Sequence, residues 1–587
     1  MKYVKLTKTN TITGNRALDT WLTHLGYDKD GVETLDKPEM PFCKNNILEN
    51  VVKQLENARQ NNFKVMVSAD YDNDGIYGGT ILVKGFRFLG FDTSYMIPNR
   101  VIDGYGMNKR LVDRAISENC QMIVTVDNGI ACREAVEYAL SKGLEVIVTD
   151  HHEIPEDNAK NVMQIAGINV IHPATMRGAN EFREISGATV AYKLMEYLLP
   201  LMTKKDYKQE LDFYRALAGV TVISDVMPLV NENRTIFKES VKYIQSHKNE
   251  ALDYFISHLP NIDFEHMDET TFGFSICPVI NAIGRLDNAE LGIQYFEAPE
   301  EDREHYLAFF LSTNDKRKKL QAECVEDVEK TIDTSDNGIC YFDDKEKINE
   351  GIIGILAGRI CNNHSKPTIV FSKTKDSDGT SFWKGSARST EQVSIINVLN
   401  DINNENSNVF LNFGGHAGAA GISIKENQKD VFVELFNKYI EKETEEEMTK
   451  YYVEVSGKEI PQLVAKMKEL KPFGNGFPKP ILHTNFDVNV LKAYFSSNRG
   501  VISNDVFELW VNLPDYLKLV RDNDYRLAFT NYQKLLFEGN KDADTSKTEY
   551  YRPKDKKIKL SMFGEVASNY FGGRDQIKFD IIEKELI

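Results

Sequence analysis

Short apolar runs alternate with stretches of helical spacing in the first third of the chain. Residues 65–69, 121–126 and 144–149 are continuous runs rich in valine and isoleucine, which is typical of strands buried on both faces. Residues 76–89 and 131–140 carry apolar positions at helical spacing instead. Strands that alternate with helices in this way predict β-α-β units. We therefore expect an α/β fold with a doubly wound, mostly parallel sheet.

Each apolar run leads directly into side chains that can bind a metal ion. In chain order the runs end on Asp70-Tyr71-Asp72-Asn73-Asp74-Gly75, on Asp127-Asn128-Gly129 and on Asp150-His151-His152. A fourth run, residues 220–224, precedes Asp225 and could be a strand or the end of a helix. The carboxyl ends of parallel strands converge on one crevice, so these side chains should meet there.

The three aspartates at 70, 72 and 74 call for a cation, because ionised carboxylates this close repel one another. An EF-hand calcium loop opens with the same pattern, but it needs a preceding helix and a glutamate at its twelfth position. Here that position is Ile81, and an apolar, β-branched run precedes Asp70. A solvated acidic turn is the usual meaning of an Asp/Asn/Gly cluster. The other strand ends favour a metal site.

With these motifs in hand, the chain resembles the DHH phosphoesterase superfamily, and within it the RecJ-type exonucleases that degrade single-stranded DNA from the 5′ end. Asp150-His151-His152 is the namesake triplet, and the resemblance spans roughly residues 60 to 480. Further motifs follow in the expected order: Ile97-Pro98-Asn99-Arg100, Gly104-Tyr105-Gly106, Ser224-Asp225-Val226, Asn281-Ala282-Ile283-Gly284-Arg285, Gly351-Ile352-Ile353-Gly354, Ser386-Ala387-Arg388, Gly414-Gly415-His416 and Pro472-Phe473-Gly474-Asn475-Gly476.

The resemblance implies a two-metal site for phosphodiester hydrolysis. One ion is assigned to Asp70 and Asp127, and the other to Asp72, Asp127, His151 and Asp225, so that Asp127 bridges them. A mixed imidazole and carboxylate set favours Mn²⁺ and tolerates Mg²⁺. His152 is expected to contact the phosphate or to pass a proton to the leaving oxygen, while Asp74 and Asp150 orient the ligands.

Some members of the superfamily carry a metal-binding histidine two residues before the first aspartate. This chain has Ser68 at that position. We therefore expect the first ion to be held more weakly than the second.

A second lobe should bind the substrate. Short β-α alternation from residue 337 ends in a glycine-rich stretch with Gly414, Gly415 and His416, and Ser386 and Arg388 precede it. A tight packing turn is the more frequent meaning of such a stretch. The resemblance also implies that Arg100, Tyr105 and Arg285 clamp the 5′ phosphate and its nucleotide, because the arginine fork binds phosphate bidentately. For any one arginine alone, a surface salt bridge would be the default interpretation.

A chain of 587 residues is long enough for three or four domains. We expect an N-terminal segment packed on the catalytic lobe, the DHH domain, a connecting helix, a DHHA1 domain and an OB-like barrel that binds single strands. Their expected bounds are 1–50, 51–300, 301–335, 336–447 and 448–587. In the barrel, Tyr494, Phe495, Tyr550 and Tyr551 are stacking residues or, for any one of them, core residues.

The net charge of −17 argues against binding DNA through the whole surface, because neutralisation of phosphates dominates such affinity. A narrow positive track would suffice for an exonuclease.

Seven cysteines without a C-x-x-C pair indicate reduced thiols. Without a signal peptide or a membrane-spanning stretch, the chain is expected to be a soluble cytoplasmic monomer, with single-stranded DNA and a single-strand-binding protein as its partners.

Three functions compete. The preferred one is a 5′ to 3′ exonuclease that releases mononucleotides in recombination, repair or replication. The second is a phosphodiesterase for short oligonucleotides or cyclic dinucleotides, as in two-lobed DHH proteins, which lack a large C-terminal module. The third is a DHH scaffold without activity in a replication complex, which would be expected to have lost metal ligands. The long C-terminal part and the nearly full ligand set favour the first.

Overall fold

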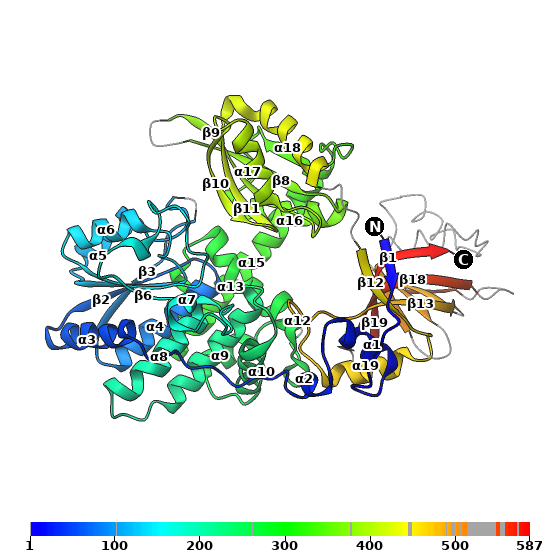
Figure 1. Cartoon of the computed structure of the whole chain (residues 1–587), viewed down its shortest axis with the longest axis horizontal. Coiled ribbons are helices and arrows are strands. Elements are labelled where there is room, and N and C mark those ends of the chain that lie inside the picture. The colour runs from blue at the N-terminus through cyan, green and yellow to red at the C-terminus, as the bar shows by residue number, and fades with distance from the viewer. Residues whose placement is uncertain are drawn as a thin grey trace. The chain divides into compact units, whose positions relative to one another are not determined.

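The computed structural model divides into two compact units, Met1–Lys37 with Met448–Ile587, and Pro38–Glu447 (Figure 1). It describes the chain except residues 1, 101, 261, 376–378, 444–448, 489, 495–498, 504–507, 513–547, 552–557, 572–573 and 587. Beyond residue 485, side chains are described only at 563–566 and 577. The predicted stacking residues Tyr494, Phe495, Tyr550 and Tyr551 therefore lie outside the described side chains.

A five-stranded parallel sheet organises the first lobe of the larger unit. Its strands lie in the order β3 (Asp92–Met96), β2 (Lys64–Ala69), β4 (Met122–Val126), β5 (Glu145–Thr149) and β6 (Asn169–Ile171). The three apolar runs are thus strands β2, β4 and β5, as predicted. Residues 220–224 are instead the last turn of helix α9 (Lys208–Ser224), the other structure that the pattern allowed.

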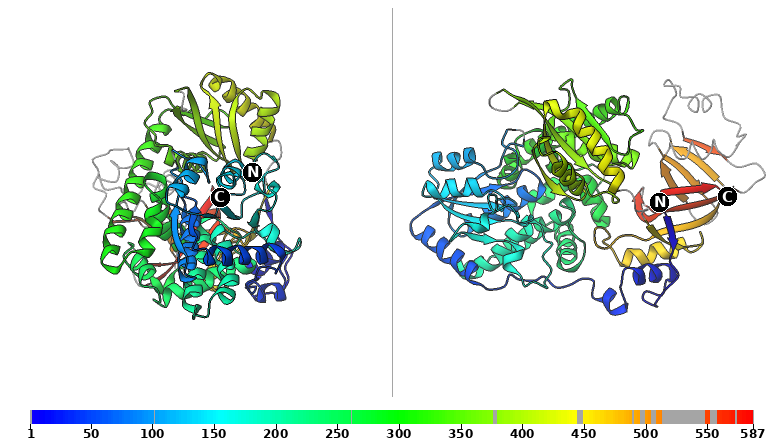
Figure 2. Two further views of the ribbon diagram at one scale, coloured as in Figure 1. Left: turned by 90° about the vertical axis from the view of Figure 1, so that its left-hand side faces the viewer. Right: turned by 45° about the horizontal axis from the view of Figure 1, so that its top comes forward.

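Helices cover both faces of this sheet, as Figures 1 and 2 show. Side chains alternate between two cores: Val65 and Val67 point into one, and Met66 between them points into the other. On the first face lie α3 (Asn46–Gln60), α4 (Asn73–Phe88), α8 (Gly187–Met202) and α9; on the second lie α5 (Lys109–Ser117) and α6 (Arg133–Ser141). The doubly wound sheet is confirmed.

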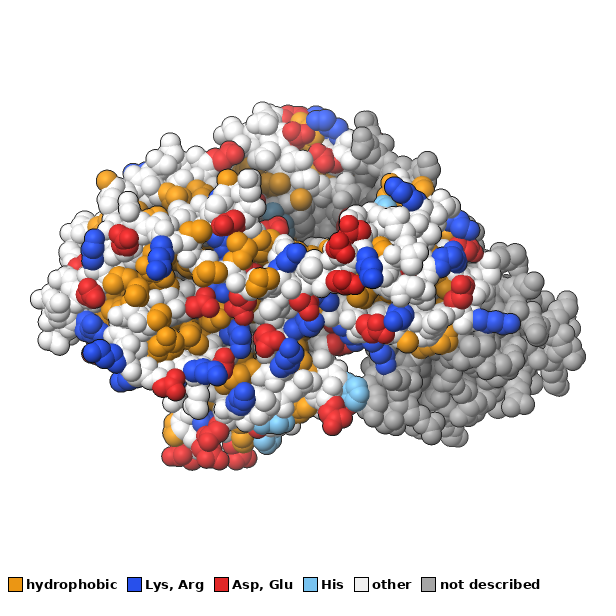
Figure 3. All heavy atoms as spheres, turned by 60° about the horizontal axis from the view of Figure 1, so that its bottom comes forward, with side chains coloured by type: hydrophobic (Ala, Val, Ile, Leu, Met, Phe, Trp, Pro, Cys, Tyr) orange, Lys and Arg blue, Asp and Glu red, His pale blue; other side chains and the backbone are white. Residues whose placement is uncertain are grey.

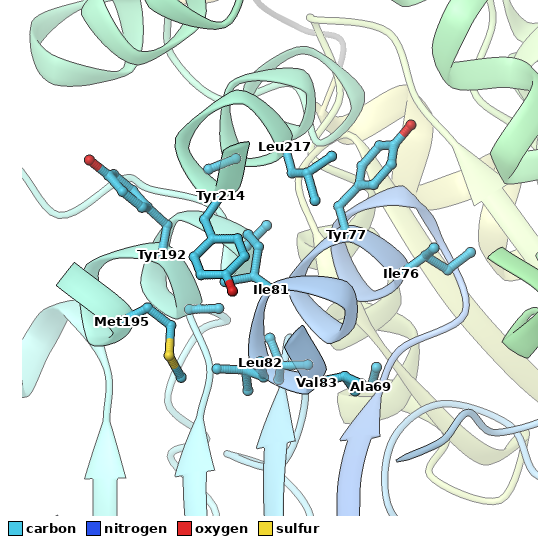
Figure 4. Packing of buried hydrophobic residues seen from close by; sticks show 14 of the residues in the cluster. Ala69, Ile76, Tyr77, Ile81, Leu82, Val83, Tyr192, Met195, Tyr214 and Leu217 are labelled. Carbon is cyan, nitrogen blue, oxygen red and sulfur yellow. The ribbon is translucent and has the colours of Figure 1, made fainter. Parts of the chain in front are cut away.

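Helix α4 carries the acidic motif at its start and is held firmly by its neighbours. Its side chains Tyr77, Ile81 and Leu82 lie among Met195 of α8 and residues of α9 (Figure 4). At Gly85 a Cβ atom would lie 2.4 Å from the Met195 sulfur, so α4 and α8 pack closely at this point. This packing gives the acidic motif a rigid base.

The remaining helices of the first lobe lead to the second. They are α7 (Pro173–Met176), α10 (Asn231–Gln245), α11 (Glu250–Ser257), α12 (Glu269–Thr271), the π-helix η3 (Phe272–Ile276), α13 (Cys277–Leu286) and α14 (Glu290–Glu297), with 3₁₀ turns η1 (Val162–Gln164) and η2 (Phe264–His266). The predicted long connecting helix is α15 (Glu300–Glu329).

The second lobe is built on a mixed sheet. Its strand order is β10 (Phe410–His416), β11 (Ala419–Lys425), β9 (Ser381–Arg388), β8 (Thr368–Lys375) and β7 (Ile339–Asp343). Helices α17 (Ile395–Glu405) and α18 (Lys429–Glu443) pack on one face, and α16 (Ile353–His364) packs on the other. The 3₁₀ turns are η4 (Glu350–Ile352) and η5 (Glu426–Gln428). An α/β second lobe is confirmed.

The smaller unit joins the two ends of the chain. Strand β1 (Lys2–Lys5) pairs in parallel with β12 (Thr449–Glu454) in a sheet completed by β13 (Ile481–Val488), β18 (Ile558–Phe571) and β19 (Arg574–Leu586). Helices α1 (Arg16–His24), α2 (Lys29–Glu33) and α19 (Ile460–Glu469) belong to the same unit. The first 37 residues thus share a unit with the C-terminal part, whereas we expected the N-terminal segment to pack on the catalytic lobe.

A second sheet of the smaller unit has the order β16 (Glu508–Asn512), β15 (Arg499–Ser503), β14 (Val490–Tyr494) and β17 (Thr548–Tyr551). The described strands form two sheets, and the OB-like barrel stays a prediction.

All seven cysteines are unpaired. Among the described residues, no helix is both long and apolar enough to cross a membrane. On the face drawn in Figure 3, acidic and basic side chains are interspersed.

Candidate metal centre and substrate site

The acidic motif lies where the direction of the sheet reverses. From β2 the chain passes through α4 to β3 on one side, and the next strand, β4, lies on the other side of β2. Asp70 follows β2 and Asp127 follows β4, so both stand at this switch point. In open α/β sheets this is the crevice where ligands bind.

Backbone contacts fix the turn between β2 and α4. Asp72 is the N-cap of α4, and its Oδ1 accepts hydrogen bonds from the backbone N–H groups of Asp74 at 2.9 Å and Gly75 at 3.3 Å. At Gly75 a Cβ atom would lie 2.3 Å from the Asp70 carbonyl oxygen, so the turn needs glycine there. The Asn73 side chain donates to the Cys277 carbonyl at 2.9 Å and ties the turn to α13.

The start of α8 holds two more members of the cluster. Asp74 accepts hydrogen bonds from the backbone N–H groups of Gly187, at 2.6 Å, and Ala188, at 2.9 Å. At Gly187 a Cβ atom would lie 2.7 Å from the Cβ atom of Asp127, so only glycine lets the helix approach this closely. Asp127 itself has a φ of +59°, a strained conformation of the kind that gathers at functional sites.

Asp225 reaches the cluster from the end of α9 through a Schellman motif. The N–H of Met227 donates to the Val222 carbonyl at 2.9 Å, and the N–H of Val226 donates to the Ile223 carbonyl at 3.2 Å. Val226, at the position where glycine is usual, has a φ of +53°. This cap turns the chain sharply and leaves Asp225 at the helix end, beside the other acids.

The two histidines have different surroundings. Nε2 of His151 lies 3.1 Å from an Asp127 oxygen and 3.6 Å from oxygens of Asp74 and Asp225. His152 is paired through Nδ1 with Asp150, at 2.8 Å. Asp150 also accepts from the N–H groups of Ile130, His151 and His152, and with these partners its pKa falls to about 2 despite its burial. Asp150 thus orients His152, whereas His151 faces the acids.

The electrostatics of the acidic cluster favour the binding of cations. Burial, together with neighbouring carboxylates, raises the pKa values of Asp70, Asp127 and Asp225 well above the ordinary value. Among the described residues, four buried ligand atoms have no hydrogen-bond partner: Asp70 Oδ1, Asp127 Oδ1, Asp225 Oδ2 and His151 Nε2. Buried polar atoms are normally satisfied. Divalent cations would satisfy these atoms and offset the repulsion, so the donor set fits metal ions.

The ligand atoms gather in three groups that could each hold an ion. The groups, whose atoms lie within 4.8 Å of one another, are Asp70, Asp72 and Asp127; Asp74, His151 and Asp225; and Asp127, His151 and His152. All the expected ligands are therefore brought together. Asp74, which we expected only to orient ligands, also lies within reach of an ion.

A cluster of arginines lies beside the acids. Arg285 lies near Arg100, Arg388 and Arg317, and burial together with these cations lowers its pKa to about 9. Burial and Arg100 also lower the pKa of Arg388. Arg100 stacks over the Tyr71 ring at 4.7 Å. Grouped cations with lowered pKa values are suited to binding an anion.

The second lobe adds polar groups to this cluster. At Gly354, in the first turn of α16, a Cβ atom would lie 3.1 Å from both Arg388 Nη2 and Ser386 Oγ, so the helix start faces these side chains. Gly414, Gly415 and His416 are exposed and belong to strand β10 of a hairpin with β11, not to a free loop. Ala419 pairs with both His416 and Arg388, which places these two at the same end of the sheet.

Tyr105 lies within the site, and its hydroxyl is already engaged. It donates to the Asp127 carbonyl at 2.9 Å and lies 3.0 Å from Nδ1 of His152. These contacts indicate that Tyr105 positions Asp127 and His152. The role in clamping the nucleotide that the sequence predicted remains untested.

Sequence reasoning missed several residues that support the site. They are Gly187, Ala188 and Arg317 on α15. Asn281 belongs to a motif that the sequence analysis named without a role, and its side chain accepts a hydrogen bond from the Asn73 N–H at 2.9 Å. Ser186-Gly187-Ala188 at a helix start was a signal that could have been used, because the backbone N–H groups of a helix N-terminus bind anionic groups. For Arg317, the long charged helix gave no such signal.

Comparison with known proteins agrees with this geometry. A model of the DHH family, N-terminal domain, matches residues 64–223, and a DHHA1 domain model matches residues 336–442. The single-stranded-DNA-specific exonuclease RecJ of Haemophilus influenzae is 28% identical over 502 residues, covering 80% of this chain and 84% of that protein. RecJ of Escherichia coli is 29% identical, covering 77% and 80%. The chain therefore combines a DHH domain with a DHHA1 domain, and it is similar to RecJ exonucleases over most of its length.

Solved structures support the same fold. RecJ of Thermus thermophilus in complex with Mn²⁺ matches with a TM-score of 0.74 at 21% identity, covering 100% of this chain and 79% of that one. A crystal structure of exonuclease RecJ bound to manganese matches with a TM-score of 0.55 at 26% identity, covering 68% and 95%. In this chain, the residues matched by the DHH model contain all the predicted ligands except Asp225, which follows them by two residues.

Proposed function

We propose that this chain is a metal-dependent exonuclease that degrades single-stranded DNA from the 5′ end and releases 5′-mononucleotides. The observation that carries the proposal is the set of buried, unsatisfied Asp and His atoms beside a cluster of arginines. The first feature suits metal ions, and the second suits a phosphate. Processing of DNA in recombination, repair or replication follows from this activity.

The proposed metal site holds two divalent ions, with Mn²⁺ preferred and Mg²⁺ tolerated. We keep Asp70 and Asp127 as ligands of one ion, and Asp72, Asp127, His151 and Asp225 as ligands of the other. Such ions would activate a water and stabilise the attacking and leaving oxygens. Ser68 is buried, and its hydroxyl has no partner among the described residues, so it adds no imidazole to the first ion.

His152 is the group proposed to meet the phosphate or the leaving oxygen. The Asp150 carboxylate holds Nδ1 of His152 and raises the pKa of that histidine to about 9, so the ring carries a proton that it can share with the substrate. Asp74 is anchored by the α8 backbone and steadies His151. These residues hold and orient groups around the reacting phosphate.

The arginine cluster is proposed to select the strand end. Arg100, Arg285 and Arg388, with Ser386 and the start of α16, form a site in which a terminal phosphate gains several donors at once. Gly414, Gly415 and His416 extend this surface along the β10 edge. A 5′ phosphate held here would leave the next phosphodiester over the acidic cluster, which gives 5′ to 3′ polarity.

The C-terminal part is proposed to hold the rest of the strand as an OB-like module. Such modules combine a basic groove with stacked aromatic side chains. A single-strand-binding protein is proposed as a partner, and the chain is proposed to act as a monomer. The competing function, hydrolysis of short oligonucleotides or cyclic dinucleotides, needs the same metal site without this module, and a scaffold role needs neither.

The test is degradation of a single-stranded oligonucleotide labelled separately at its 5′ and 3′ ends, with Mn²⁺ and with EDTA. We expect mononucleotides from the 5′ end, lost in EDTA and in Asp127→Ala. Hydrolysis of dinucleotides alone would support the small-substrate enzyme. Inactivity on both substrates would support the scaffold.

A further inference from the structure

Three apolar side chains stand out because they face solvent near the site. Phe274 is 82% exposed, Ile102 76% and Val226 67%, the highest values among the large apolar side chains that the structure describes. Each belongs to a segment that carries a site residue: Val226 follows Asp225, Ile102 lies between Arg100 and Tyr105, and Phe274 precedes α13. Contiguous exposed apolar patches mark ligand-binding surfaces, whereas single exposed apolar side chains are normal, so the position of these residues relative to the site decides their meaning.

Phe274 is presented by a rigid element. It stands in the middle of π-helix η3, whose first and last residues, Phe272 and Ile276, are fully buried. The Phe272 ring packs edge-on against Phe237 at 5.1 Å. A π-helix is rare and is often found at functional sites. Two buried anchors with an exposed aromatic ring between them fix the place from which Phe274 projects.

The end of α9 lies next to this element. A Cβ atom at Gly273 would lie 3.6 Å from Ile223, and the Cys277 sulfur lies 4.0 Å from the Val220 carbonyl oxygen. The Schellman turn with Val226 directly follows these α9 residues. A β-branched side chain at a positive φ costs free energy, and here it is held out into solvent. The backbone next to Phe274 therefore lies against the end of α9 that leads to Val226.

Successive residues along helix α13 lie next to different parts of the site. Arg285 stands near its end, among the arginines; Asn281, farther back, contacts the turn that carries Asp70 and Asp72. Phe274 precedes its start, at a distance from Arg285 of about 15 Å at the usual rise of a helix. The order along α13 thus runs from the phosphate-binding arginines past the acidic cluster to Phe274.

We propose that Phe274, supported by Val226, forms an apolar shelf on which a base downstream of the cleaved phosphodiester stacks. This inference rests on the proposed function and adds a substrate-binding residue to it. With the 5′ phosphate at Arg285 and the cleaved bond at the acids, the remaining strand passes the edge where Phe274 lies. An aromatic face accepts any base, as an exonuclease without sequence preference requires.

The test measures KM and kcat of Phe274→Ala on a long single-stranded oligonucleotide. Base stacking on an aromatic ring predicts an increase in KM of roughly 5- to 100-fold upon alanine substitution. The kcat value stays unchanged, because Phe274 does not touch the reacting atoms. Phe274→Trp should restore KM, and Leu201→Ala, at an exposed residue near the far end of α8, should leave it unchanged.

A second arm uses strands that lack one base at successive downstream positions. At one position the missing base should raise KM for the native enzyme and remove the difference between it and Phe274→Ala. An unchanged KM for Phe274→Ala, or a difference that persists at every position, overturns the shelf. If the native enzyme itself fails to degrade single strands, the proposed function fails first. Equal unfolding temperatures of the variants exclude loss of fold as the cause.

Discussion

Among single residues, Asp127 is the one on which most of the site converges. Its backbone is strained, its carbonyl holds Tyr105, and one carboxylate oxygen lies 3.1 Å from His151 without a hydrogen-bond partner in the described structure. Three of its four neighbouring aspartates belong to the acidic motif. Ionised Asp127 therefore lowers the stability of the chain without metal, while it supplies a ligand that the proposed metal site needs.

We predict that Asp127→Asn lowers nuclease activity by about 10³-fold or more, because it removes the bridging ligand. In EDTA the same variant should be no less stable than the native chain, since one of several repelling carboxylates is gone. Asp92→Asn, at an exposed residue at the opposite end of β3, is the control and should keep full activity. Thermal unfolding and the oligonucleotide assay measure both effects. A large loss of stability in EDTA would contradict this prediction.

At the scale of elements, α13 connects the metal-binding turn to the second lobe. At Gly284 a Cβ atom would lie 1.8 Å from the Tyr71 carbonyl oxygen, and at Gly351 one would lie 1.9 Å from that of Arg285. Arg285 also donates to the Gly351 carbonyl at 3.3 Å. Close packing at two glycines thus sets how the acidic turn and the arginines face each other.

Gly284→Ala should lower the free energy of unfolding by about 3 kcal/mol, because the obstacle is backbone that cannot yield easily. It should also lower activity by displacing the Asp70–Asp72 turn. Gly421→Ala is the matched control, since nothing lies within 4 Å of its Cβ position. Denaturant unfolding measures the difference. Equal stability of the two variants would show that the packing at Gly284 is not needed.

Buried charges hold the first residues of the larger unit, around Glu39, in place. Glu39 accepts from the fully buried Lys193 at 2.9 Å and from the Tyr192 hydroxyl at 2.9 Å. Although burial opposes its ionisation, Lys193 and these hydrogen bonds bring its pKa below the usual 4.5. A lowered pKa in the folded state contributes stability above the unfolded value, and this contribution is lost as the pH falls.

Glu39→Gln should therefore cost about 2 kcal/mol at neutral pH, as expected for lost hydrogen bonds to a charged group. The difference from the native chain should shrink as the pH falls below 4.5, where Glu39 begins to be protonated in the unfolded state. Glu326→Gln, in an exposed pair with Lys330, is the control and should change little. A difference that does not depend on pH would refute the assignment to Glu39 ionisation.

Local sequence patterns were enough to predict the strands and where they end, because β2, β4 and β5 are buried on both faces and are therefore continuous apolar runs in the sequence. They also placed Asp70, Asp127 and Asp150 at one edge of the sheet. They could not decide between strand and helix before Asp225, since a short apolar run fits both. The pairing of β1 with β12 and the approach of Gly187 to Asp127 depend on contacts between distant segments. No local pattern identifies the distant partner in such a contact.

At the scale of the whole molecule, a chain with a net charge of −17 is proposed to bind a polyanion. The arginine cluster accounts for this, because it concentrates cations at one place beside the proposed metal site. Affinity should then depend on a few phosphate contacts and should fall with salt.

Arg388→Ala should weaken binding of single strands and make it less dependent on salt. For single strands, each lost phosphate contact lowers the log–log salt slope by about 0.7. Lys438→Ala, at an exposed lysine paired with Glu405, should leave the slope unchanged. Fluorescence anisotropy in Ca²⁺, without hydrolysis, over a range of salt measures both slopes. The same slope in Arg388→Ala as in the native chain would remove Arg388 from the phosphate site.

The most direct test of the central claim is the number of Mn²⁺ ions that the chain binds, measured by calorimetric titration. We predict two ions of unequal affinity for the native chain, the weaker at Asp70 beside Ser68. Asp127→Asn should lose tight binding of both, whereas Asp92→Asn should keep it. A native chain that binds no Mn²⁺, or an Asp127→Asn variant that still binds two ions tightly, would contradict the proposed metal centre.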